Sequence, residues 1–580
     1  MHIEKNVCEA ILGTLMNIPG KTKDTKGVRE YFKSKGLRPE LWPQTSGNNR
    51  TKEMETGGAK TKGKGKGKGK GKGKEKGNDK GKKKTHYLPP ACYTLSKLEK
   101  RLFCECLYGI KAPSGYSSNM KRFVSLNGEL KLTSMKSHDC HVMMQTFLPI
   151  AIRGILPKHV RHSITSLCSF FNTICSKVLD PSTLDELQNK VIQTLCEFEM
   201  YFPPSFFDIM VHLICHLVRE IKLCGPVFMR WCYPFERHMG VLQDKVRNPA
   251  QPEGSMIQGN VGEEVGNFVA EYLAKPEPIG LPTSRHEGRL EGNGTIGSKL
   301  ISPPTHKLLQ AHLYVLHHIL AVHPYLVMHK QELANEYPSK GERELTQLHN
   351  REFIKWFQDK VMGELEVAGN TVCETVQYLA LGPREAVQSY QGYDVNGYTF
   401  WTERQDQKSL SVQNSGVSLV ASSREYASAK DGSPVDAKLS YYGRVQDIWE
   451  LKYGTKLTVG LFWCKWADNN KRCVKRDDPC GFTLVDLGRL RETEEPFILV
   501  SQAKQIFYIT DPANKKWSIV VPGKRNILGV GDVEDEDEYD AFDDTPPFTN
   551  PETEVTNNVD NDTNYMRSDH TEGILVDDEI

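Results

Sequence analysis

Two histidines and one glutamate lie close together in the sequence, and all three are residue types that bind metal ions. His212 and His216 are four residues apart in an apolar stretch, and Glu236 follows in the next predicted element. Residues i and i+4 share one face of a helix, so both imidazoles would point the same way. Imidazole nitrogens bind zinc, and carboxylate oxygens bind magnesium. The spacing therefore admits a metal site with His212 and His216 as ligands and Glu236 as a catalytic carboxylate.

A structural role for the same residues is the competing interpretation. The spacing of apolar residues predicts a helix over 206–223, which Gly225 and Pro226 end. A second helix is predicted to begin near Val227, with Pro234 as a kink or as the true start. In a core helix pair the apolar side chains would fill the interior and the histidines would hydrogen-bond locally. Pairs of histidines at this spacing recur by chance, so the pattern alone favours the core helix pair.

A second group of polar residues, the HDCH sequence at 138–141, also resembles a metal-binding pattern. Only one cysteine lies there, so we interpret these residues as polar caps at a helix start. The chain has 15 cysteines but no Cys-x-x-Cys pair, and Cys104 and Cys106 are separated by a single residue, which suits zinc poorly. With no signal peptide ahead of them, we expect free thiols in a reducing, intracellular compartment.

The charge of the chain is strongly segregated although its formal net value is +2. Residues 60–84 contain 13 lysines against Glu75 and Asp79, and residues 531–580 contain 18 acidic residues against Arg567. The Gly-Lys repeat is either a basic arm for phosphate contacts or nuclear import, or an expanded repeat without a selected role. As a basic arm it would bind nucleic acid through Lys62, Lys64, Lys66, Lys68, Lys70, Lys72, Lys82, Lys83 and Lys84.

The patterns of the chain predict an α+β multidomain protein. Amphipathic helical spacing dominates the first half and predicts helices that include 7–16, 25–35, 160–178 and 183–199. Gly36 is predicted to end the second of these helices, and Ser96 to cap a helix that runs to about Gly109. No strand is predicted between residues 86 and 275. Aromatic and β-branched runs between turns predict a small antiparallel β domain near the C-terminus, with its aromatic residues in the core rather than stacked on bases. No apolar run reaches the ~20 residues that span a bilayer. The predicted segments are a first helical unit at 1–44, a disordered Gly-Lys insertion at 45–85, a helical domain at 86–275, a linker at 276–300, a helical region at 301–389, the β domain at 390–525 and a disordered acidic tail at 526–580.

Several long motifs resemble one protein family. They include HIEKNVCEAILGTLMNIPGKTKD, YLPPACYTLS, CECLYGIKAPSGYSSN, MKSHDCHVMMQTFLPIAIRGILPKHVRHSI, the stretch from EMYFPPSFFDIM to YPFERHMG, and YYGRVQDIWEL. These segments resemble the C-terminal part of plant CACTA (En/Spm-type) transposases, in which domain of unknown function 4218 precedes domain of unknown function 4216. The resemblance covers nearly all of residues 1–44 and 86–525, and the Gly-Lys repeat departs from it as an insertion.

The resemblance implies DNA cut-and-paste by an RNase H-like core, of which the helical block here would be the C-terminal remnant. In that family three carboxylates hold two divalent metals, usually Mg²⁺, that activate the attacking oxygen and stabilise the leaving one. In the wider clade a Cys-x-x-Cys pairs with two histidines at a zinc site. By this analogy His212 and His216 correspond to the histidine pair, and Glu236 to the last carboxylate.

The function that we expect depends on the family motifs that this sequence lacks. The two aspartates and the Cys-x-x-Cys belong upstream of the HIEKN motif, with which this sequence starts, so Mg²⁺ or Zn²⁺ is expected only if that upstream core were supplied. We expect a transposon-derived protein that is catalytically incomplete and retains weak DNA or protein binding. The alternative is an interaction module that pairs with a full-length transposase or another nuclear protein. Nuclear localisation is expected, without a membrane or a small-molecule substrate.

Overall fold

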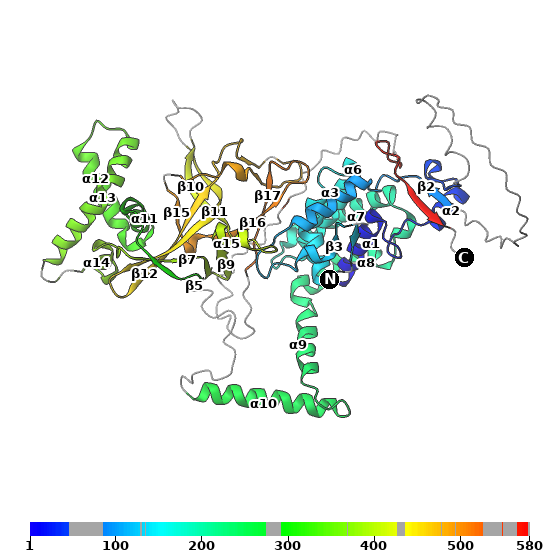
Figure 1. Cartoon of the computed structure of the whole chain (residues 1–580), viewed down its shortest axis with the longest axis horizontal. Coiled ribbons are helices and arrows are strands. Elements are labelled where there is room, and N and C mark those ends of the chain that lie inside the picture. The colour runs from blue at the N-terminus through cyan, green and yellow to red at the C-terminus, as the bar shows by residue number, and fades with distance from the viewer. Residues whose placement is uncertain are drawn as a thin grey trace, which may run out of the picture.

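The computed structural model describes residues 1–45, 85–127, 130–133, 135–273, 292–367, 369, 371–425, 435–476, 478–493, 495–525, 548 and 565–577. Three parts follow one another along the long axis of the molecule: a helical body that contains the N-terminal helices, an antiparallel sheet, and a group of helices at the far end of the sheet (Figure 1). None of the described helices is long and apolar enough to cross a membrane.

The helical body packs around one large apolar core. In its first helix Val7, Ile11 and Leu15 recur at every fourth position and are fully buried, and the helix begins at His2 rather than at Val7 as predicted. The body consists of α1 (His2–Met16), α2 (Lys26–Lys35), α3 (Lys97–Gly109), α4 (Ser137–Val142), α5 (Leu148–Ala151), α6 (Lys158–Ile174), α7 (Leu184–Tyr201) and α8 (Ile209–Cys224). Two further helices, α9 (Tyr233–Asp244) and α10 (Pro252–Tyr272), project away from the body (Figure 1).

Local sequence rules fix several helix ends. Ser96, predicted as a cap, forms a capping box with Glu99 at the start of α3: each side chain accepts a hydrogen bond from the other residue's backbone N–H. Gly36 ends α2 in the left-handed conformation, with φ of 65°, which costs glycine little.

The helix that contains the two histidines, α8, starts at Ile209, three residues later than predicted. The next helix, α9, starts at Tyr233 rather than near Val227. Asp208 caps α8 by accepting hydrogen bonds from the backbone N–H groups of Met210 and Val211, and the preceding Pro204–Phe206 forms a 3₁₀ turn. A second 3₁₀ turn, Val227–Arg230, precedes α9. Pro234 lies in the first turn of α9, so it marks the start of that helix and does not kink it.

The sheet is antiparallel, as predicted, but larger than the small domain we expected. Its ten strands follow the order β13-β14-β17-β16-β10-β11-β12-β15, with β7 paired to β11 and β6 paired to β7. They are β6 (Lys299–Ile301), β7 (Val387–Tyr390), β10 (Gly416–Glu425), β11 (Val435–Tyr453), β12 (Leu457–Trp466), β13 (Val474–Lys475), β14 (Leu484–Val485), β15 (Phe497–Leu499), β16 (Lys504–Thr510) and β17 (Ser518–Pro522).

Strand β11 links the two halves of the sheet. Residues 435–444 pair with β10 and residues 443–453 pair with β12, with a bulge between Val445 and Asp447. Bulges bend a strand and increase its twist, so one long strand can serve two neighbours. The predicted core role of the aromatic residues is confirmed for Phe400, Trp449, Phe462, Phe507 and Trp517, which are all buried.

Strands also form in the last residues of the predicted linker, from residue 292 on, and in the region after it. β5 (Asn293–Ile296) pairs with β8 (Gly392–Val395), β8 pairs with β9 (Tyr398–Trp401), and β6 pairs with β7. The helices that follow pack on the sheet through a shared core that includes Phe353, Phe357, Trp449 and Phe497. These helices are α11 (Thr305–His318), α12 (His323–Glu336), α13 (Glu342–Leu365) and α14 (Glu374–Ala380), and α15 (Glu403–Lys408) follows β9. The rest of the predicted linker, residues 276–291, lies outside the described residues.

Two further predictions need correction. Short strands occur between residues 86 and 275: β2 (Thr85–Leu88) pairs with β1 (Gln44–Thr45), and β3 (Val124–Ser125) pairs with β4 (Lys131–Leu132). Within the segment predicted to be a disordered tail, β18 (Ile574–Asp577) forms and pairs with β2 on the helical body (Figure 1). These strands are too short and isolated to produce a sequence pattern, and long-range pairing stabilises them.

Buried ion pairs join the helical body to the sheet. Arg153, after α5, donates hydrogen bonds to both carboxylate oxygens of Asp478 and of Asp511 at 2.8–3.1 Å. Apolar residues of the sheet, including Phe507 and Trp517, belong to the core of the helical body.

Candidate metal centre

The two histidines predicted from sequence lie together on the exposed face of α8. Their Nε2 atoms are 3.3 Å apart and both side chains are exposed. The opposite face of α8 packs into the core through Val211, Ile214 and Val218. The helix therefore has the core role that the spacing favoured, with histidines that contact each other locally.

Glu236 lies in the first turn of α9, a helix that projects away from the helical body (Figure 1). Its side chain is exposed and lines a shallow cavity between α9 and α10, together with Phe235, Met239 and Met256. No hydrogen bond or ion pair between Glu236 and either α8 histidine occurs in the described part of the chain.

These residues do not fit the metal sites that the family resemblance implies. Zinc sites in proteins have at least three protein ligands where the histidine pair offers two, and two-metal catalysis requires several carboxylates. Within the described ranges, neither the histidine pair nor Glu236 belongs to a group of three or more His, Cys, Asp or Glu side chains close enough to share an ion. The nine lysines expected to bind nucleic acid, from Lys62 to Lys84, lie outside the described residues.

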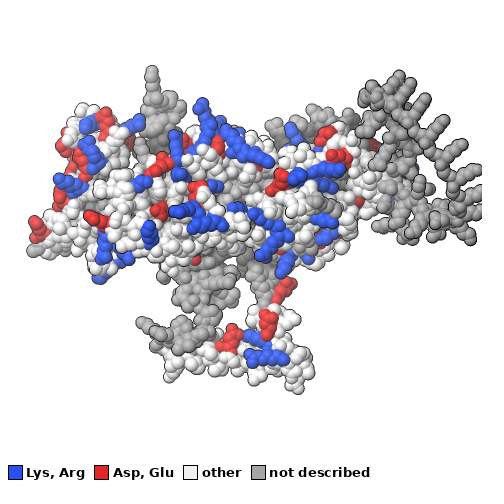
Figure 2. All heavy atoms as spheres, in the orientation of Figure 1, with Lys and Arg blue, Asp and Glu red and all other residues white. Residues whose placement is uncertain are grey.

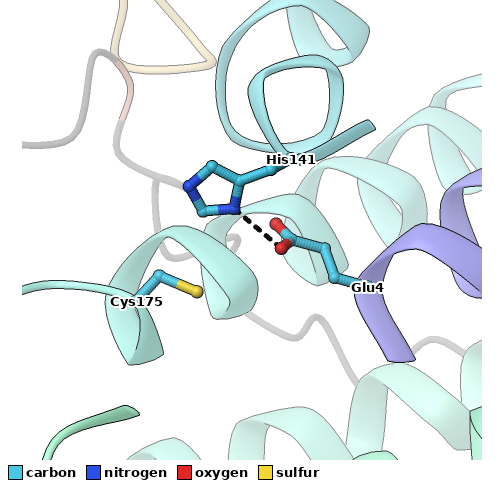
Figure 3. A group of neighbouring side chains, drawn as sticks. All are labelled: Glu4, His141 and Cys175. Atoms are coloured by element: carbon cyan, nitrogen blue, oxygen red, sulfur yellow. Dashed lines mark hydrogen bonds and ion pairs between the residues drawn. The ribbon is translucent and has the colours of Figure 1, made fainter. Parts of the chain in front are cut away.

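A different group of ligand-type side chains does converge, inside the helical body. Glu4 of α1, His141 of α4 and Cys175 at the end of α6 each offer one ligand atom, and these atoms lie within 4.8 Å of one another. Figure 3 shows Glu4 and His141 directed at each other, with the Cys175 thiol beside them. His141 Nδ1 is 2.7 Å from Glu4 Oε2. We call this group the Glu4–His141–Cys175 cluster.

The cluster lies largely inside the helical body, and a tryptophan ring packs against it. Glu4 is 1% exposed and His141 is 5% exposed, while Cys175 is half-buried. The Trp231 ring packs edge-on against His141 at a centroid distance of 5.4 Å. The other carboxylate oxygen, Glu4 Oε1, is buried and has no hydrogen-bond partner among the described residues. A buried carboxylate oxygen without a partner costs free energy, so this position is chemically unsatisfied.

Thiol catalysis is a poor interpretation of the cluster. Burial raises the pKa of the Cys175 thiol, and the neighbouring Glu4 carboxylate raises it further. Reactive thiols have the opposite setting, a lowered pKa beside positive charge. The arrangement can instead serve as a buried ion pair between Glu4 and His141, or as a nitrogen, oxygen and sulfur ligand set for a cation.

The sequence around His141 favoured a capping role for residues 138–141. Capping is observed for Asp139, whose carboxylate accepts a hydrogen bond from the backbone N–H of Lys136 at 3.0 Å. His141 instead faces Glu4, 137 positions away in the chain. No spacing rule connects residues so far apart, so the sequence contains no local pattern that would have found the cluster.

Comparisons with known proteins find two families. Residues 174–281 match a domain of unknown function (DUF4218), and residues 449–520 match a second domain of unknown function (DUF4216). The first region covers α7 to α10 with the histidine pair and Glu236, and the second lies within the sheet. The chain matches no curated protein and no solved structure.

Proposed function

We propose that the chain is a transposon-derived protein related to the C-terminal part of CACTA transposases, and that it binds DNA without cutting it. The order of the two matched domains supports the relationship, since DUF4218 precedes DUF4216 as the resemblance requires. In this proposal the helical body descends from the end of an RNase H-like core, and the protein acts in the nucleus.

The observation that supports the absence of cleavage is the isolation of Glu236. Two divalent metals need several carboxylates, and in the described part of the chain Glu236 belongs to no group of three or more His, Cys, Asp or Glu side chains that could share an ion. We expect no Mg²⁺- or Mn²⁺-dependent nicking of transposon-end DNA by the purified chain. Robust turnover that Glu236→Gln abolishes would refute the proposal.

The observation that supports DNA binding is a group of cations at one end of the sheet. β13 and β17 both pair antiparallel with β14, so they run parallel to each other and their preceding loops lie at the same end. These loops hold four exposed cations, which we call the basic edge: Lys471, Arg472, Lys515 and Lys516. Figure 2 shows Lys and Arg side chains gathered over the middle of the molecule.

The basic edge is placed for phosphate contacts rather than for base stacking. Lys475 and Lys516 lie over the Trp517 ring at 4.4 and 5.5 Å from its centroid, but the ring itself is 5% exposed. Bases therefore cannot stack on it, while the ammonium groups of the loops remain exposed. Such a surface binds a polyanion with little sequence preference.

Filter binding across a salt titration tests this surface. Replacing the four cations of the basic edge with alanine should weaken DNA binding and reduce the slope of log affinity against log salt, by up to about 0.9 for each phosphate that the protein no longer neutralises. The matched control replaces four exposed cations on α12, α13 and their connection: Lys330, Lys340, Arg343 and Lys355. A slope that changes only when residues 60–84 are deleted would assign binding to the Gly-Lys repeat instead.

A second candidate function is an interaction module for a full-length transposase. The observation that favours it is the projecting pair α9 and α10 (Figure 1). Ile257, Val261, Val265 and Phe268 recur at helical spacing along α10 and are each at least half exposed. The double variant Ile257→Asp, Phe268→Asp should abolish binding to the full-length transposase and preserve DNA affinity. Unchanged co-sedimentation with the transposase would eliminate this candidate.

A further inference from the structure

We propose that the Glu4–His141–Cys175 cluster is a zinc site that fastens α1 to the helical body. The proposal is independent of the proposed DNA binding, and it concerns a place in the fold different from the exposed histidine pair on α8. Its three ligands come from α1, α4 and the end of α6, which meet only in the folded chain.

The ligand types suit zinc. Zinc in proteins is bound by carboxylate oxygen, imidazole nitrogen and thiolate sulfur, and three protein ligands leave a fourth position for water. Hard cations such as Ca²⁺ and Mg²⁺ take only oxygen ligands as a rule, so the imidazole and the thiol argue against them. With bonds of about 2.0–2.3 Å, tetrahedral ligand atoms lie roughly 3.3–3.8 Å apart. The present separations, 2.7 Å for the Glu4–His141 pair and below 4.8 Å for the group, would reach this geometry by small side-chain rotations.

Glu4 Oε1 provides a second, independent reason to place a cation at the cluster. Buried carboxylate oxygens are normally hydrogen-bonded or paired with positive charge. Glu4 is 1% exposed, and Oε1 has no hydrogen-bond partner in the described part of the molecule. A bound cation would satisfy this oxygen directly, by bidentate coordination or by neutralising the carboxylate.

The surroundings of His141 Nδ1 point the same way. Glu4 Oε2 lies 2.7 Å and the Gln145 amide nitrogen 3.2 Å from this one ring nitrogen. A ring nitrogen presents either a hydrogen or a lone pair, so it cannot both donate to the carboxylate and accept from the amide. If a zinc ion took the lone pair of Nδ1, Glu4 would become a neighbouring ligand rather than a hydrogen-bond acceptor.

Zinc would also change the state of Cys175. Burial and Glu4 keep this thiol protonated by raising its pKa, and coordination to zinc deprotonates a thiol. Because the ligands converge only in the folded chain, the free energy of zinc binding adds to the free energy of folding. Removal of zinc should therefore loosen α1 first, since one of the three ligands anchors that helix.

The test uses the full chain, purified, stripped with a chelator and titrated with zinc alone. We expect one zinc ion per chain by elemental analysis and a higher melting temperature with zinc than without. Glu4→Gln and Cys175→Ser should each weaken zinc binding at least about tenfold. In the cobalt-substituted protein, the thiolate-to-metal charge-transfer band should be present in the wild type and absent in Cys175→Ser. Circular dichroism of each variant establishes that it is folded.

Matched controls separate this site from the rest of the chain. Glu9→Gln changes a partly exposed carboxylate on the same helix as Glu4, and Cys196→Ser changes an exposed thiol on α7, so both should leave zinc affinity unaltered. Zinc binding that Glu4→Gln and Cys175→Ser do not affect, or that is lost in His212→Ala or His216→Ala, would overturn the proposal. So would a folded chain that binds no zinc.

Discussion

At the scale of single residues, Arg153 shows how one side chain can join two domains. It is 8% exposed and donates hydrogen bonds to Asp478 and Asp511, whose side chains are also buried. Paired guanidinium and carboxylate groups of this kind have strong directional preferences. Without Arg153, the two aspartates would be buried negative charges with no positive partner from this residue.

We predict that Arg153→Ala lowers the free energy of unfolding by about 3–5 kcal/mol, because removing one partner of a buried ion pair leaves the other charges unpaired. The comparison is Arg101→Ala, which removes an exposed i,i+4 pair with Glu105 and should cost at most about 1 kcal/mol. Urea denaturation followed by circular dichroism measures both. Equal effects of the two substitutions would show that Arg153 does not hold the interface.

At the scale of helices, the unit formed by α11, α12 and α13 encloses three neighbouring histidines. His329 Nδ1 and His349 Nδ1 are 2.8 Å apart, and the rings of His317 and His349 stack at 5.5 Å. Burial lowers the pKa of His317 to about 4 and that of His349 to about 3, and it also lowers the pKa of His329. The helices therefore hold these imidazoles in the neutral form.

This unit should lose stability as the pH falls from 6.5 toward about 4. Over that window the unfolded chain takes up protons that the folded helices exclude, so the folded state becomes less favoured. Hydrogen exchange of residues 311–361 as a function of pH measures the loss. The variant His317→Gln, His349→Gln should flatten the dependence, and His318→Gln, at an exposed position on α11, should not. A dependence that the double variant leaves unchanged would point to other titrating groups.

At the scale of the whole molecule, the chain returns to its own N-terminal body after the sheet is complete. Arg567 is 5% exposed, donates to Glu99 at 2.7 Å and to the backbone oxygen of Thr94, and so anchors the tail beside α3. β18 then pairs with β2 over four residues. An acidic segment can therefore be ordered where a buried arginine anchors it and the edge of a strand pairs with it.

Arg567→Ala should release this tail, because Glu99 and the tail would lose their shared ion pair. Hydrogen exchange of residues 85–88 and 574–577 should then accelerate together, while the sheet stays protected. Gly573→Ala should act similarly, since a Cβ there would collide with the backbone oxygen of Leu88. Glu572→Ala, which removes an exposed hydrogen bond to the backbone of Lys97, is the control with little effect. Slow exchange in the Arg567→Ala variant would mean that strand pairing alone retains the tail.

The sequence alone determined the local elements of this protein. Apolar spacing located α1, α6, α7 and α8, because a helix buries one stripe of its own residues. Ser96 and Gly36 marked helix ends, because capping satisfies backbone groups within a few residues. Aromatic and β-branched runs located the sheet for the same local reason.

Only the tertiary structure decided which distant residues meet. The pairing of Glu4 with His141 and the docking of β18 on β2 both join segments far apart in the chain. Such contacts depend on the packing of whole elements, and no spacing of residue types along the chain records them. His212, His216 and Glu236 match the chemistry of a metal site by type and spacing, and only the fold shows that their side chains are exposed on α8 and α9.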